Sequence, residues 1–248
     1  MGSIVELTEL GDGVVLITME DRTSRNSFSK GLIEGLILAF EEVGKNKNYK
    51  VVIMTGYENY FCCGGTKDEL IAIYKGEIGF NDVDFFTLPL YCPIPVIAAM
   101  QGHGIGGGFV FGLYADFPIL GRENIYTTNF MRYGFTPGMG GTMIIPLRLG
   151  NVVGNEMLFT AENYRGGELK ERGVPMMVVP RAEVLNEAIK MSRRLADKPR
   201  LSLITLKAHV TASIKEQLPG IIQKELAMHD VTFHQSEVVE RIQSLFGQ

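Results

Sequence analysis

Apolar residues recur with two different periods along the first 120 positions, and each period predicts a different element. Two runs rich in β-branched residues flank a Gly-Asp-Gly turn at 11–13, which predicts a β-hairpin over residues 4–10 and 14–19. Over residues 29–43, apolar side chains return every three or four positions, which predicts an amphipathic helix. Further short apolar runs predict buried strands at 51–55, 95–100 and 117–120.

The order of these elements predicts an α/β fold. Strands alternate with helical stretches, so we expect a mainly parallel sheet with right-handed crossovers over a core of residues 1–180. Residues 181–248 are helical by pattern and too few to bury a core of their own, so we expect them to cover the core or a neighbouring subunit. Pro199 and Pro219 mark helix boundaries there. The expected helices are 182–196, 201–212, 218–233 and 236–246.

Composition excludes several classes of protein. Hydrophobic residues make up 46% of the 248 positions and charged residues 21%, as in an average globular chain. A formal net charge of −4 gives no basic surplus for a nucleic-acid partner, and apolar runs are too short to span a membrane. Three cysteines and no secretory signal pattern indicate the reducing cytoplasm.

Glycines cluster in two turns that each follow a predicted strand. The first turn covers 61–66 and the second 101–109, and a helix is expected after each. Thr66 is expected to cap the first of these helices, with Glu69 three residues on as the reciprocal partner. Glycine lets the backbone approach a ligand closely, and the first turn of a helix leaves amide hydrogens without internal partners. Two such turns side by side would aim two amides at one acceptor, such as an enolate oxygen.

The second turn also permits a different interpretation. Gly102, Gly104 and Gly107 match a dinucleotide-binding G-x-G-x-x-G, and Glu123 follows the next strand where a ribose-binding acid would lie. The motif stands in mid-chain, however, and the segment between Gly107 and the next strand is short for that fold. A structural role for either turn alone is also open.

Four stretches give the chain a family resemblance, in the order that the family has them. They are 52–66, 95–102, 106–116 and 134–142, with the sequences VIMTG to FCCGGT, PVIAAMQG, GGG to AD, and GFTPGMGGT. With these motifs the chain resembles the crotonase (enoyl-CoA hydratase/isomerase) superfamily. The resemblance implies a spiral of ββα turns, a C-terminal helical region for trimerisation, and a homotrimer or dimer of trimers. It also implies a thioester substrate held by the amides of Gly65 and Gly107.

Two departures from this family argue against a hydratase. Hydratases use two glutamates to add water, and the matching positions here are Val110 and Phe130. Neither side chain moves a proton, so hydration by the two-glutamate route is excluded.

A narrower resemblance covers nearly the whole chain. Its motifs are 92–95, 99–103, 114–117, 129–137, 163–166 and 225–233. They are similar to the decarboxylating crotonase homologue of polyketide β-branching cassettes. That resemblance implies decarboxylation of 3-methylglutaconyl to 3-methylcrotonyl on an acyl carrier protein, through a dienolate. It implies no cofactor other than the phosphopantetheine arm of the carrier, or CoA, as the substrate carrier.

The narrower resemblance also assigns side chains. His229 matches the histidine of the late helix motif and is the candidate acid that protonates the dienolate. A lysine from the stretch between Lys67 and Asp84 is expected to hold the departing carboxylate, with Lys75 the first choice and Lys67 the second. Candidate substrate-binding residues are Tyr74, Tyr91 and Phe130.

Other features stay open or are judged structural. No His or Asp at a suitable spacing completes a zinc site with Cys62 and Cys63, so they are interpreted as packing residues. A basic dock for an acidic carrier would draw on Arg22, Arg25, Lys30, Arg165 and Lys224. The alternatives to a decarboxylase are an enoyl thioester isomerase, another CoA-thioester enzyme, or a non-catalytic thioester- or carrier-binding module.

Overall fold

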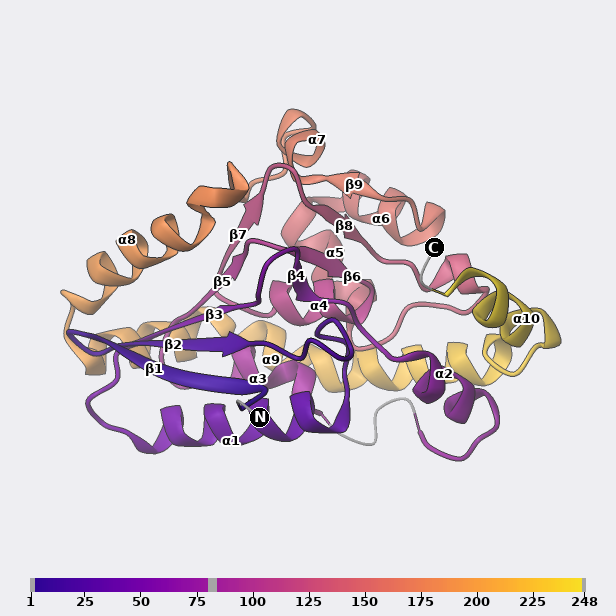
Figure 1. Cartoon of the computed structure of the whole chain (residues 1–248), viewed down its shortest axis with the longest axis horizontal. Coiled ribbons are helices and arrows are strands. Elements are labelled where there is room, and N and C mark those ends of the chain that lie inside the picture. The colour runs from indigo at the N-terminus through magenta and orange to yellow at the C-terminus, as the bar shows by residue number, and fades with distance from the viewer. Residues whose placement is uncertain (1–2, 80–83, 247–248) are drawn as a thin grey trace.

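The strands of the protein form two sheets (Figure 1). The computed structural model describes residues 3–79 and 84–246. In the described part, the larger sheet has the strand order β1 (Val5–Gly11), β2 (Val14–Met19), β3 (Val51–Thr55), β5 (Val96–Met100), β7 (Phe117–Gly121) and β10 (Met177–Val179). The smaller sheet has the order β4 (Tyr60–Cys62), β6 (His103–Ile105), β8 (Ile125–Thr127) and β9 (Tyr164–Arg165).

The chain passes between the two sheets in a repeating way. A strand of the larger sheet is followed by a short strand of the smaller one and then by a helix, as in β3–β4–α2 and β5–β6–α4. Successive turns pair in parallel, with Val52 opposite Val96 and Ile97 opposite Phe117. This repeat is the ββα spiral of the crotonase fold. The short strands were not predicted, because two or three residues carry no readable period.

Helices complete the layers around the two sheets. The N-terminal ones are α1 (Lys30–Lys45), α2 (Lys67–Tyr74), η1 (Phe85–Thr87), α3 (Leu88–Tyr91) and α4 (Gly107–Leu113). The later ones are η2 (Met131–Tyr133), α5 (Gly141–Leu149), α6 (Asn151–Thr160), α7 (Gly166–Glu171), η3 (Arg181–Glu183), α8 (Val184–Ala196), α9 (Arg200–Thr232) and α10 (Ser236–Leu245). No helix within the described ranges combines the length and apolarity that a membrane span needs.

The hairpin and the first helix form as their local sequence requires. β1 and β2 pair antiparallel, and Gly11 and Gly13 at their turn have φ values of 84° and 79°, in the left-handed region. Ser29 caps α1 by accepting a hydrogen bond from the Leu32 amide at 3.1 Å. Both predicted elements are therefore confirmed.

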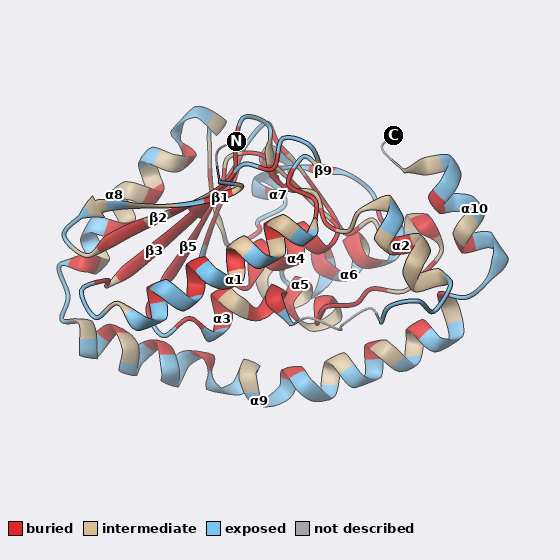
Figure 2. Ribbon diagram, turned by 60° about the horizontal axis from the view of Figure 1, so that its bottom comes forward, coloured by how far each residue is buried: buried red, intermediate tan, exposed pale blue. Residues whose placement is uncertain are grey.

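The two faces of the larger sheet are both buried. Val51 and Ile53 face α8, where they pack with Val184 and Ala188. The alternate residues of the same strands, among them Met54, belong to the main core. Figure 2 shows β3 and β5 in the colour of buried residues. Burial on both faces explains why these strands read as continuous apolar runs.

The prediction of separate helices at 201–212 and 218–233 is wrong, because α9 runs unbroken through Pro219. Figure 2 shows it as one long bowed helix. An internal proline removes one helical hydrogen bond and costs about 3 kcal/mol. Leu218 and Glu225, each 1% exposed, pack on α5 and the loop before it, and this tertiary packing holds the helix together across the proline.

Candidate active site

Each of the two glycine turns leads directly from a strand of the smaller sheet into a helix. The first leaves β4 and enters α2, which Thr66 and Glu69 cap reciprocally. The Thr66 hydroxyl accepts from the Glu69 amide at 3.2 Å, and the Glu69 carboxylate accepts from the Thr66 amide at 2.9 Å. The second leaves β6 and enters α4, with Gly106 as N-cap at φ 54° and ψ −125°. The cap that the sequence predicted on Thr66 is confirmed.

The two turns touch backbone to backbone, because β4 and β6 are parallel neighbours. A Cβ on Gly64 would lie 2.8 Å from the Ile105 carbonyl oxygen and 3.1 Å from the Gly107 nitrogen. A Cβ on Gly108 would lie 2.2 Å from the Cys62 carbonyl oxygen. Side chains are therefore excluded at this contact.

Gly65 and Gly107 line both of the cavities that meet at the two turns. Among the described residues, neither amide donates to a protein acceptor. Gly107 is the first residue of α4, so its N–H has no partner inside the helix. An outer cavity of about 620 Å³ and an inner cavity of about 250 Å³ share the lining residues Gly65, Leu70, Gly107, Phe130 and Phe135.

The outer cavity carries positive charge and has more polar side chains in its lining than the inner one. Arg25, Lys67 and Arg132 line it. Its neutral polar lining comes from Thr23, Ser24, Ser27, Asn129 and Asn163. Such a surface suits an anionic or amide-rich ligand arm.

The inner cavity is walled by aromatic and aliphatic side chains. They are Phe28, Ile33, Leu70, Ile73, Ile78, Phe85, Phe86, Phe130, Phe135 and Met139. In the described part of the chain, Glu69 is the one ionisable side chain in this lining. A group seated here would contact mainly apolar side chains, which offer few competing partners for its hydrogen bonds to the two amides.

The candidate cations occupy different places. Lys67 lines the outer cavity, and its Nζ donates to the Gln243 carbonyl of α10 at 3.3 Å. Lys75 pairs with Glu77 at 3.6 Å, is more than half exposed, and lines neither cavity. Residues 80–83 of the stretch expected to supply the lysine lie outside the described residues.

His229 lies on α9, where a single aromatic side chain separates it from the cavities. Its Nε2 donates to the Thr136 carbonyl at 2.8 Å, and its ring packs edge-on to Phe135 at a centroid distance of 6.3 Å. Phe135 lines both cavities, whereas His229 is not among their lining residues. Burial lowers the pKa of His229, so the imidazole is neutral at neutral pH.

The three aromatic candidates also lie in different places relative to the cavities. Phe130 lines both cavities. Tyr74 packs against His234 at 6.4 Å between ring centroids, outside both linings. Tyr91 is 51% exposed on α3, with the Lys215 Nζ 5.3 Å from its ring centroid.

Two positions lack the side chains that hydration by the two-glutamate route needs. Val110 is fully buried in α4, and Phe130 presents a ring to both cavities, so neither hydratase glutamate has a replacement at its position. Cys63 also lines the outer cavity, but burial raises its pKa to about 12 and keeps it a thiol. In the described ranges no group of three or more His, Cys, Asp or Glu is placed to hold a metal ion.

Sequence reasoning missed Glu69, Phe135 and Met139 as lining residues. The sequence indicates a role for Glu69 only as a helix cap, and Phe135 and Met139 stand out only as members of the 134–142 motif. No local signal shows that residues 135–139 fold back onto the Gly107 turn, because that contact joins segments about 30 positions apart.

Comparison with known proteins places this site in a family. The pattern of the enoyl-CoA hydratase/isomerase family matches residues 9–246. The bacillaene synthase decarboxylase PksI of Bacillus subtilis (strain 168) is 54% identical over 245 residues, which cover 99% of this chain and 98% of that protein.

Solved structures give the same result. A protein of a dehydratase/decarboxylase enzyme couple involved in polyketide β-branching superposes with a TM-score of 0.98 at 53% identity, covering 99% of this chain and 100% of that one. The ECH2 decarboxylase domain of CurF from Lyngbya majuscula superposes with a TM-score of 0.95 at 51% identity, with the same coverage.

Proposed function

This chain belongs to the enoyl-CoA hydratase/isomerase family, and we propose that within it the protein is a decarboxylase of polyketide β-branching. The proposed reaction converts a 3-methylglutaconyl thioester on an acyl carrier protein to 3-methylcrotonyl. One observation carries the proposal: the two amides of Gly65 and Gly107 lie at the entrance of an apolar cavity, and neither hydratase glutamate is present.

The chemistry follows from where charge develops. When the bond to the carboxyl group breaks, carbon dioxide leaves and its electron pair moves through the alkene to the thioester oxygen. The resulting dienolate oxygen needs preorganised donors, and each such donor lowers the barrier by about 3–4 kcal/mol in other enzymes. Gly65 and Gly107 supply two.

The dienolate then needs one proton on carbon, and we propose His229 as its source. The ring is neutral in the free protein because burial lowers its pKa. Because Phe135 separates the ring from both cavities, this role requires Phe135 to turn aside when substrate binds, and a substrate carboxylate then close to the ring favours the charged imidazolium. Once carbon dioxide has left, that charge has lost its partner, and proton transfer to carbon is favoured. Glu69 is the competing donor, since its carboxyl group lines the inner cavity.

Lys75 and Lys67 are the proposed partners of the substrate carboxylate. Lys67 has the stronger geometric support of the two, because it lines the outer cavity beside the first glycine turn. We place Phe130 in the wall against which the acyl group packs, and Tyr74 and Tyr91 as weaker candidates for substrate contact.

The proposed partners are an acyl carrier protein and further copies of this chain. Arg25 lines the outer cavity and would meet an acidic carrier or its phosphate. A trimer, or a dimer of trimers, would cover apolar side chains that are otherwise exposed. They are Leu147, Val152, Phe159, Leu201, Leu206 and Val210. In this proposal residues 1–180 form the catalytic core and 181–248 the assembling region.

Intact-mass measurement of the carrier tests the function. We expect a 3-methylglutaconyl-loaded carrier protein to lose the mass of one carbon dioxide when incubated with the enzyme. An unchanged mass with a shift of the double bond indicates an isomerase. An unchanged carrier that still binds the protein indicates a binding module. Either result overturns the proposal.

A further inference from the structure

Met139 has a backbone conformation that a bulky residue rarely adopts. Its φ is 61°, in the left-handed region, and Gly140 follows at 71°. Glycine adopts this region freely, whereas a side chain with a Cβ is strained there. Such strain persists only where the surrounding structure holds it, and it clusters at functional sites.

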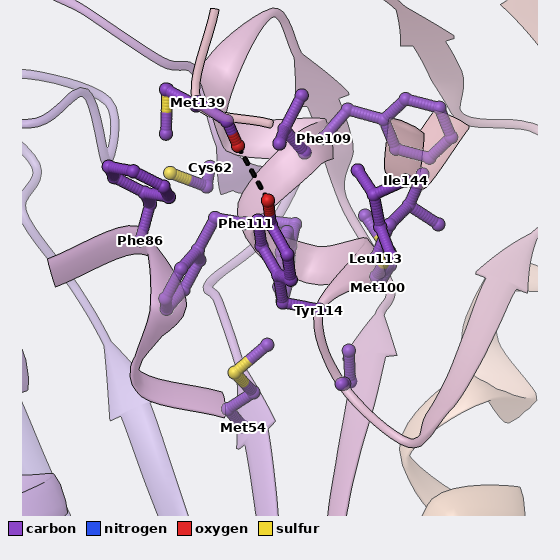
Figure 3. Packing of buried hydrophobic residues seen from close by; sticks show 14 of the residues in the cluster. Met54, Cys62, Phe86, Met100, Phe109, Phe111, Leu113, Tyr114, Met139 and Ile144 are labelled. Atoms are coloured by element: carbon purple, nitrogen blue, oxygen red, sulfur yellow. Dashed lines mark hydrogen bonds between the residues drawn. The ribbon is translucent and has the colours of Figure 1, made fainter. Parts of the chain in front are cut away.

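Two buried side chains hold this strained pair. The Tyr114 hydroxyl, at the end of α4, donates to the Met139 carbonyl at 2.7 Å (Figure 3). The Glu225 carboxylate, on α9, accepts from the Gly140 amide at 2.6 Å and from the Thr142 amide at 2.9 Å. Tyr114 and Glu225 are each 1% exposed, so water does not compete for these bonds.

The strained backbone places the Met139 side chain against Gly107. A Cβ on Gly107 would lie 2.6 Å from the Met139 Sδ, so the thioether rests directly on that turn. Met139 also lines the inner cavity together with Phe28 and Phe86. The space beside one of the two donors is thus set by a side chain from another segment.

We infer that Met139 is a specificity-determining residue, which limits the acyl group beside the thioester to a short one. This inference rests on the proposed function only in taking an acyl thioester as the ligand. Tyr114 and Glu225 act as positioning residues, because they fix the peptide from which the thioether projects.

Binding of unreactive thioesters tests the inference without any turnover. Saturated acetyl-, butyryl-, hexanoyl- and octanoyl-CoA are titrated into the protein by calorimetry. We expect wild-type affinity to fall at least tenfold between butyryl- and octanoyl-CoA. Met139→Ala should remove most of that fall, and Tyr114→Phe should reduce it two- to threefold.

Two further variants separate this role from a general effect on folding. Met143→Ala removes a methionine four residues away that lines neither cavity, and it should keep the wild-type length limit. Met139→Gly removes the same side chain and also relieves the backbone strain, so its melting temperature should be no lower than that of Met139→Ala, and it should lose the limit.

Three results overturn the inference. If Met139→Ala and Met139→Gly both keep the wild-type limit, Met139 does not set the acyl length, and the proposed function is unaffected. If Met143→Ala relaxes the limit as much as Met139→Ala, the effect is not specific to this side chain. If the wild-type protein binds octanoyl-CoA as tightly as butyryl-CoA, there is no length limit for Met139 to set, and the proposed function is unaffected.

Discussion

The two cavities that meet at Gly65 and Gly107 differ in size and in charge. The outer one is larger and lined by Arg25, Lys67 and Arg132. The inner one is less than half its volume and apolar apart from Glu69 and the glycine backbone. A ligand that spans both would keep its charged carrier arm in the cationic half and its acyl group in the apolar half.

This contrast shows how a small number of groups can drive the reaction. Hydrogen bonds to a developing negative charge are stronger beside apolar surroundings than in bulk water, and the two donors stand where the apolar cavity begins. Charge that moves from the substrate carboxylate to the thioester oxygen ends beside these donors. The donors therefore favour the products of bond cleavage.

Removing one of the two amide donors between the cavities should have the largest effect on kcat. Gly65→Pro deletes the N–H, and we expect kcat to fall by about 10²–10³-fold. Gly65→Ala is its matched control, because an added Cβ would meet only Leu70 at 3.5 Å, an ordinary contact. Steady-state kinetics on the loaded carrier measure both, and equal losses in the two variants would argue against an oxyanion role.

Removing the proposed proton donor should have the next largest effect on kcat. His229→Gln keeps a donor for the Thr136 carbonyl but not the acid, and we expect kcat to fall by about 10²-fold or more. Glu69→Gln keeps the α2 cap, since glutamine serves in a capping box, and should stay close to wild type. The reverse pattern would assign the proton to Glu69.

A substitution in the outer cavity should change binding rather than chemistry. Arg25→Gln is expected to raise KM several-fold for the carrier-linked substrate and to leave kcat nearly unchanged, because uniform binding is lost. The same variant should show a weaker dependence of KM on salt concentration. A drop in kcat at constant KM would place Arg25 in the reaction itself.

The smallest expected effect is on stability at low pH. The pKa of His229 is lowered by burial, so the unfolded chain binds this proton more readily than the folded one. Stability should thus be complete above the ordinary histidine pKa of about 6.5 and fall as pH drops toward the lowered value. Thermal melts at pH 7.5 and 5.5 should show a smaller loss for His229→Gln than for wild type.

The regular elements and the glycine turns could be predicted from the sequence because their causes are local. The hairpin, α1 and the Thr66 cap each depend on residues within a few positions of one another. The continuity of α9 could not be predicted, since local rules end a helix at Pro219, and only packing on distant segments overrides them.

The site was predictable only in part. The amides of Gly65 and Gly107 could be predicted from strand–turn–helix patterns that are readable in the sequence. The lining of the inner cavity could not, because Glu69, Phe135 and Met139 come together only through the fold. Likewise, no pattern shows that Lys75 pairs with Glu77 or that Phe135 stands between His229 and the cavities.

The direct contact between the two glycine turns has a wider consequence. Since main-chain atoms alone set the spacing of the Gly65 and Gly107 nitrogens, the anion receptor is independent of the residues around it. Acidic residues, lysines and the residues of the cavity walls can then be substituted without changing the geometry of the two amides. A protein with this backbone arrangement can acquire a different reaction of a thioester enolate through substitutions around the amides alone.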